Sequence, residues 1–71
     1  MRKVQLKKEH IQHLMKLPES GMGYQIVDIT LKDGQQFKER TVLNSQLLLL
    51  EDNEDIDPNY IKRIELTKNK Y

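Results

Sequence analysis

The chain has 71 residues, of which 32% are charged and 37% hydrophobic, and its formal net charge is +1. A chain of this mass folds as one small domain that buries roughly 60% of its unfolded surface, so a deep catalytic cleft is not expected. The sequence contains no cysteine, which excludes a disulfide framework, a thiolate zinc site and a cysteine nucleophile. We therefore expect a single domain over residues 1–71.

The charges are unevenly distributed along the chain. Residues 1–16 carry five basic side chains and one acidic one, residues 51–57 carry five acidic side chains, and basic residues return after Pro58. This pattern indicates either that the two ends bind a polyanion or that they contact the acidic loop.

Nothing in the sequence indicates a membrane segment. The longest apolar run, Leu47–Leu50, is far shorter than the roughly 20 residues that span a bilayer. The N-terminus also lacks the apolar core of a secretory signal. We expect a cytoplasmic protein with no membrane partner.

The first predicted element is a short helix over residues 7–16, within a basic N-terminal segment, 1–18. Its apolar residues recur at helical spacing: Ile11, Leu14 and Met15. Pro18 ends the helix because a residue before proline avoids the α region. No capping side chain precedes this helix, so it must pack on the rest of the domain or fray.

A connector with two glycines leads into the clearest strand, Tyr24–Leu31. Its side chains alternate, with Gln25, Val27, Ile29 and Leu31 on one face and Tyr24, Ile26, Asp28 and Thr30 on the other. Asp33-Gly34 supplies the positive φ that a tight hairpin requires, so Phe37–Leu43 should return antiparallel. The register of this second strand stays open, since Phe37 and Leu43 share one face while Val42 points to the other.

The second half of the chain predicts four further elements. They are a turn at Asn44-Ser45, a strand at Leu47–Leu50, a single helical turn over 57–60 and a last strand at Ile61–Thr67, with Ile64 and Leu66 facing the core. Asp57 is expected to cap the helical turn, and a proline follows it at the first helical position. Because Leu47–Leu50 is apolar throughout, it should be buried on both faces or lie at an interface.

This order of elements predicts a mainly β (α+β) fold. We expect a small SH3-like or Sm-like barrel, partly open, over residues 24–67, with a short N-terminal helix and a one-turn helix before the last strand. Such folds close or cover their edges, because an unpaired strand edge invites aggregation.

Few residues suggest catalysis or metal binding. His10 and His13 would share a helix face beside Glu9, but two imidazoles and one carboxylate are a weak metal signal, and we expect surface histidines. Neither Ser20 nor Ser45 lies in the strand-to-helix elbow of a nucleophile. The sequence therefore predicts no enzyme, no cofactor and no metal site.

Two sets of residues are candidates for binding. The first is basic and lies on the expected barrel: Lys32, Lys38, Arg40, Lys62 and Arg63. With exposed aromatic rings beside them, these side chains would suit single-stranded nucleic acid, although they would equally keep edge strands soluble. The aromatic candidates are Tyr24, Phe37 and Tyr60, of which Phe37 is expected in the core.

The second set is Met22 and Tyr24, in and after the glycine-flanked connector. The two glycines let the chain pass close to the barrel, and Met22 would then fill a gap. The alternative is that this segment forms a lip that contacts a ligand or a partner.

Two resemblances follow from these motifs. Leu31-Lys32-Asp33-Gly34 followed by Phe37, together with Leu47–Leu50 and Glu51-Asp52, resembles the first motif of the Sm-like RNA-binding proteins, which also carry an N-terminal helix. Leu17-Pro18-Glu19-Ser20-Gly21-Met22-Gly23-Tyr24-Gln25 and the segment from Val27-Asp28 to Gly34 are similar to a family of small bacterial proteins of unassigned function. The second resemblance implies a compact β-rich domain in a bacterial cytoplasm, and it carries over no known activity.

Our leading interpretation is a noncatalytic small barrel that binds another protein or itself. Leu47–Leu50 carries apolar side chains on both sides of a strand, and a core this thin would gain from association. The alternative is a module that binds single-stranded nucleic acid through the basic strand face.

Overall fold

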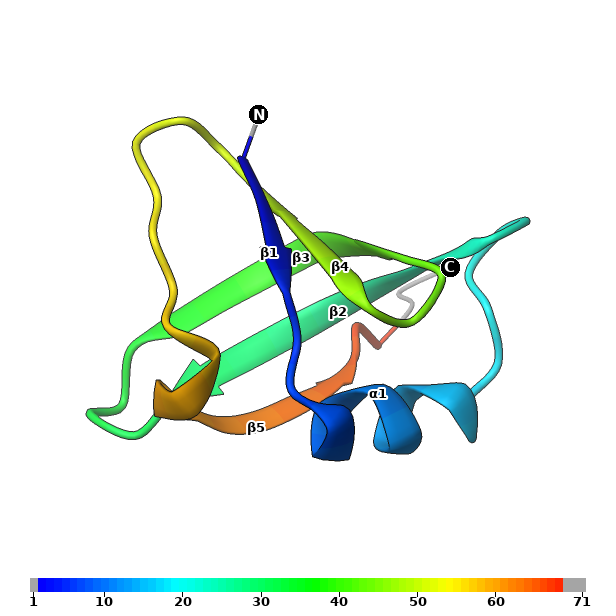
Figure 1. Cartoon of the computed structure of the whole chain (residues 1–71), viewed down its shortest axis with the longest axis horizontal. Helices are drawn as coiled ribbons and strands as arrows, with labels where there is room; N and C mark the ends of the chain where they lie inside the picture. Colours follow the sequence, from blue (N-terminus) through cyan, green and yellow to red (C-terminus); the bar gives the residue numbers. More distant parts are fainter. Residues whose placement is uncertain (1, 69–71) are drawn as a thin grey trace.

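The computed structural model describes residues 2–68. One sheet holds five strands in the order β1-β4-β3-β2-β5, and every pairing in it is antiparallel. The strands are β1 (Arg2–Gln5), β2 (Tyr24–Leu31), β3 (Gln36–Leu43), β4 (Leu47–Leu50) and β5 (Ile61–Leu66), and they are joined by the helix α1 (Lys8–Met15) and the 3-10 turn η1 (Pro58–Tyr60) (Figure 1).

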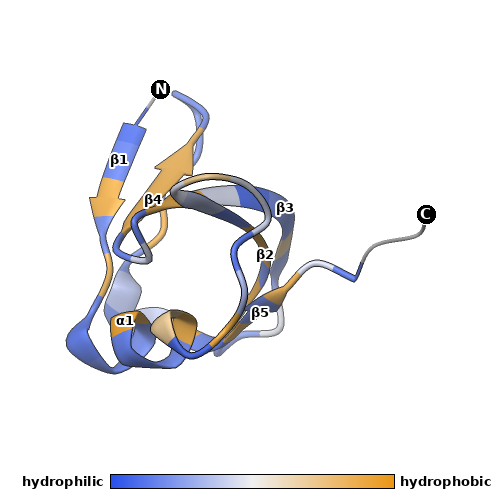
Figure 2. Ribbon diagram, turned by 90° about the vertical axis from the view of Figure 1, so that its right-hand side faces the viewer, coloured by the Kyte–Doolittle hydropathy of each residue, from blue (hydrophilic) through white to orange (hydrophobic). Residues whose placement is uncertain are grey.

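The sheet curls into a partly open barrel, and α1 lies across the opening between β5 and β1 (Figure 2). The helix inserts Leu14, which is fully buried, into the interior. The other buried apolar residues come from every strand except β1, from Leu6 after β1 and from Ile56 before η1. The predicted mainly β fold with a short helix and a partly open small barrel is thus confirmed.

Most of the predicted elements are present within a residue or two. In β2, Gln25, Val27, Ile29 and Leu31 are all buried, as the alternation predicts. The two predicted turns have the positive φ that tight turns require, at Gly34 and at Asn44 and Ser45. At η1 the Asp57 side chain accepts a hydrogen bond from the Asn59 N–H at 2.9 Å, so its predicted capping role is confirmed.

The prediction for the N-terminal segment needs two corrections. Residues 1–18 are not helical throughout, because Arg2–Gln5 forms β1 and pairs with β4 along its whole length. Only Val4 of this strand is apolar, so the sequence gives no local alternation to reveal it. Met15 is 69% exposed and does not join the helix face that packs on the barrel.

A β-bulge in β3 settles the register that the sequence leaves open. Val27 lies opposite Arg40 and Ile29 opposite Phe37, so Asp28 faces two residues of β3, Lys38 and Glu39. The extra residue reverses the alternation, and Phe37 therefore packs against the same core as the buried Val42. Glu39 has a positive φ of 57°, and its N–H donates to the Asp28 carboxylate at 3.0 Å.

The most connected side chain of the interior is the amide of Gln25, which is only 1% exposed. Its Nε2 donates to the carbonyl oxygen of Leu14 at 2.9 Å and to those of Leu17 and Pro18 at 3.3 Å each. Its Oε1 accepts from the Ser45 hydroxyl at 3.2 Å. One buried side chain thus binds the last turn of α1 and the segment after it, and joins them to the β3–β4 turn.

We expect Gln25→Leu to lower the free energy of unfolding by about 1–3 kcal/mol, since it removes a buried amide that binds the carbonyls of Leu14, Leu17 and Pro18. Urea denaturation measures this change. The matched control is Gln12→Leu, because Gln12 is exposed on α1 and such a change costs no more than about 0.5 kcal/mol. Equal effects of the two substitutions would contradict the role of the buried amide.

Candidate functional site

The barrel carries apolar side chains on its outer surface as well as inside. Val42 is buried in the core, so its neighbour Leu43 points outward. The register places Leu43 between Tyr24 of β2 and Leu47 of β4, which lie in one row across three adjacent strands. Ile26 and Leu49 are two residues further along their strands and share this face.

We call this surface the outer apolar face; its residues are Tyr24, Ile26, Leu43, Leu47 and Leu49. Tyr24 is 37% exposed and the other four are half-buried. The half-buried apolar residues that pack against the core are different ones, namely Val4, Ile11, Leu17, Phe37 and Leu66. The predicted strand Leu47–Leu50, which Figure 2 shows as hydrophobic from end to end, thus contributes Leu48 and Leu50 to the core and Leu47 and Leu49 to the outer surface.

A tight turn precedes β2 and presents Met22, which is 98% exposed. The Tyr24 N–H bonds to the Gly21 carbonyl at 3.5 Å, and Gly23 supplies the positive φ, 81°, at the second central position of the turn. The prediction that Met22 fills a gap is therefore wrong, because the turn holds this side chain away from the barrel.

This turn is fixed to the rest of the molecule by hydrogen bonds. The Asn44 N–H in the β3–β4 turn donates to the Gly23 carbonyl at 2.9 Å, and the Ser20 hydroxyl accepts from the Ile26 N–H at 2.8 Å. The Tyr24 ring lies so close over Gly21 that a Cβ there would fall 2.3 Å from the ring. Tyr24 therefore has a defined position at the margin of the outer apolar face.

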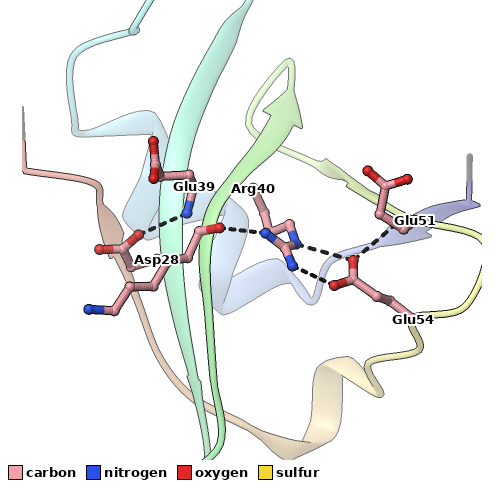
Figure 3. Close-up of polar contacts among 6 residues, drawn as sticks. Asp28, Glu39, Arg40, Glu51 and Glu54 are labelled. Carbon is pink, nitrogen blue, oxygen red and sulfur yellow. Dashed lines mark hydrogen bonds and ion pairs between the residues drawn. The ribbon is translucent and has the colours of Figure 1, made fainter.

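Arg40, one of the predicted nucleic-acid contacts, is held by the acidic loop (Figure 3). Its Nε donates to Glu54 Oε1 at 3.1 Å, and its Nη2 bonds to the second oxygen of the same carboxylate. Its guanidinium also lies 5.7 Å from the centre of the Phe37 ring. The Glu51 N–H donates to Glu54 as well, at 3.0 Å, so this ion pair closes the loop onto the barrel.

The remaining basic candidates do not form one positive surface. Over the outer side of β2, β3 and β5 lies a shallow hollow of about 790 Å³ that combines both charges: Lys38, Arg63 and Lys68 with Asp28, Glu39 and Glu65. Lys62 and Arg63 also line the groove between β5 and α1. Lys32 is exposed after β2, where its N–H bonds to the Tyr60 carbonyl at 2.9 Å.

The basic end of the chain also contacts the acidic loop, since Arg2 lies 3.6 Å from the Asp55 carboxylate. This contact and the Arg40–Glu54 pair account for part of the charge pattern without any polyanion. Only the second pair is shielded from water, because its side chains are 28% and 16% exposed.

The two histidines lie in the groove between α1 and β5. His13 is 3.5 Å from the Glu65 carboxylate, whereas His10 Nδ1 is buried and makes no hydrogen bond. Within residues 2–68, no three His, Cys, Asp or Glu side chains are grouped so that they could hold a metal ion. Burial lowers the pKa of His10 below its usual value, which keeps the imidazole neutral.

The described part of the chain contains no helix with the length and apolar character needed to cross a membrane. Comparisons with protein-family models, with curated proteins and with solved structures give no match. In the sequence, the alternation of β2 and the four leucines of β4 indicate the outer apolar face. The outward direction of Leu43 follows only once the β-bulge fixes the register of β3.

We expect Glu54→Gln to release the acidic loop, with faster hydrogen exchange over residues 51–56 than in the wild type. The Arg40 guanidinium, more than the Glu51 N–H, lowers the pKa of Glu54 below its ordinary value of 4.5. The stabilising effect of the Glu54 carboxylate is therefore complete above this ordinary value and is lost as the pH falls through the lower folded-state pKa. Hydrogen-exchange rates of residues 51–56, followed from about pH 6 to pH 3, measure this loss. Glu51→Gln is the control, and an equal release there would contradict the role of Glu54.

We expect acidification to weaken the packing of α1 through His10. Burial depresses the pKa of His10 from 6.5. The contribution of the neutral imidazole to the free energy of unfolding is therefore complete above that value and is lost as the pH falls through the folded-state pKa. His10→Gln should therefore flatten the dependence of the urea midpoint on pH between about pH 7 and pH 5. Gln12→Leu, on the exposed side of α1, is the control and should leave the dependence in place. An unchanged slope in His10→Gln would refute this assignment.

Proposed function

We propose that this protein is a noncatalytic protein-interaction module that binds its partner through the outer apolar face. The observation that supports this proposal is the row formed by Tyr24, Leu43 and Leu47 on the outside of three adjacent strands. The interior already has its own complete set of buried residues, so these outer side chains are not needed to build it. Contiguous apolar surface outside a complete core is typical of a docking surface.

The chemistry of the face favours a protein over other ligands. An aromatic ring and several aliphatic side chains at low exposure offer a preformed apolar anchor site, of the kind that carries most of the energy of protein interfaces. Met22 stands at the margin of this site on a turn held by hydrogen bonds, and methionine adapts to partners of varied shape. The predicted lip of Met22 and Tyr24 becomes part of the proposed surface.

Single-stranded nucleic acid is the less favoured ligand. Binding a phosphate backbone needs cations that are free and gathered along one groove. Arg40 is committed to Glu54, and the hollow that contains Lys38 and Arg63 also contains three carboxylates. The other basic residues are better explained as solvated charges on a small barrel.

Site-specific photo-crosslinking in cells tests the proposal. A benzophenone amino acid is placed at position 24 or 47 of the outer apolar face and, as a control, at position 12 on the exposed side of α1. We expect a discrete covalent adduct with a protein at the first two positions and none at the third. Nuclease treatment before electrophoresis identifies any adduct with nucleic acid.

A second variant makes the result specific. Leu47→Asp adds a charge to the outer face and leaves the core untouched, so the adduct formed from position 24 should fall at least about tenfold. Leu48→Asp would unfold the core and is not informative. An adduct that is insensitive to Leu47→Asp, no adduct above the control, or an adduct with nucleic acid would overturn the proposal.

A further inference from the structure

The two edges of the sheet are treated differently by the fold. Beside β5, the edge is covered by α1, whose His10 and His13 line one groove with Lys62 and Arg63, and whose Leu14 is buried in the core. Beside β1, no strand of the described chain pairs with the outer side. An unpaired edge is a template for another strand, so β1 is the place where a further strand would add to this sheet.

The hydrogen bonds of the β1 side define which backbone groups are free. The Leu6 N–H donates to the Gln46 carbonyl at 2.9 Å, and the ladder runs on with Val4 opposite Leu48. In an antiparallel ladder the direction of the backbone groups alternates from residue to residue. The N–H and C=O groups of Lys3 and Gln5 therefore point away from β4, toward the free side.

We infer that this edge pairs with the β1 strand of a second copy of the chain, antiparallel and about a twofold axis at Val4. In this register Lys3 lies opposite Gln5 of the other copy, Gln5 opposite Lys3, and Val4 opposite Val4. All four free backbone groups of each strand find partners, and the contact is closed by symmetry. No like charges lie directly opposite each other.

The sequence of the edge selects this register over its neighbours. Sliding the pairing by two residues in one direction places Lys3 opposite Lys3, and sliding it in the other places Lys3 opposite Lys7. Both alternatives oppose like charges, which destabilises a strand pair. At the ends of the favoured pairing, the Arg2 charge is balanced by Asp55 at 3.6 Å and the Lys7 charge by Glu9 at 3.1 Å. This self-complementarity is why we infer a second copy as the occupant.

The inferred contact uses the edge of β1 and leaves the outer apolar face free. It goes beyond the proposed function and does not depend on it. Because β4 lies next to β1, a pair of copies would carry two outer apolar faces on one continuous sheet.

Sedimentation equilibrium of the full chain, at concentrations up to about 500 µM, tests the inference. The Kd of the dimer is measured while the charge at position 5 is changed. We expect a reversible dimer in the wild type. Gln5→Glu places a carboxylate opposite Lys3 twice in the dimer and should lower its Kd by roughly 2- to 30-fold. Gln5→Lys opposes two lysines and should raise the Kd by a similar factor. Lys3→Glu combined with Gln5→Lys should restore the dimer.

A backbone test is independent of charge. Gln5→Pro removes an N–H that faces the free side and leaves the pairing with β4 intact, so we expect a folded monomer by circular dichroism and sedimentation. Shifts of the same sign in Gln5→Glu and Gln5→Lys, or monomers throughout the series, would refute the inference. So would a dimer that survives Gln5→Pro but is lost in Leu47→Asp, which would instead place the contact on the outer apolar face.

Discussion

The buried amide of Gln25 is the contact on which the arrangement of one whole end of the barrel depends. A helix of only eight residues has little stability of its own, and its last carbonyls must find donors. From the inner face of β2, Gln25 adds a side-chain donor to the Leu14 carbonyl, which also accepts the Leu17 N–H, and its Oε1 accepts from Ser45. An apolar residue at this position would fill the space but would break the link from the end of α1 through β2 to the β3–β4 turn.

The hydrogen bonds of Gln25 also determine where the neighbouring surface elements lie. It fixes α1 across the opening of the barrel, and it holds the β3–β4 turn where Asn44 can bond to the turn that carries Met22. Tyr24, next to Gln25 in β2, then points outward at a defined place beside Leu43. In the middle of β3, Arg40 binds Glu54 and holds the acidic loop on the barrel.

Much of this fold could be predicted from local patterns, because the alternation of β2, the turn residues and the Asp57 cap act within a few residues of each other. The strand β1 could not, since its only apolar residue gives no period and its partner lies more than forty positions away. The pairing of Arg40 with Glu54 and the bulge at Glu39 are likewise tertiary. As a result, the sequence identified Tyr24 correctly as outward-facing, misplaced Met22 in a gap, and counted Arg40 as a free cation.

Native-state hydrogen exchange tests the central role of Gln25 most directly. The amides to follow are those of Ser20, Ile26 and Asn44, whose hydrogen bonds hold the turn that carries Met22 and join it to the β3–β4 turn. If Gln25 joins this end into one unit, these amides should share one opening free energy, and in Gln25→Leu they should lose protection together while the β2–β5 ladder keeps its own. Separate opening free energies in the wild type, or unchanged protection in Gln25→Leu, would contradict it.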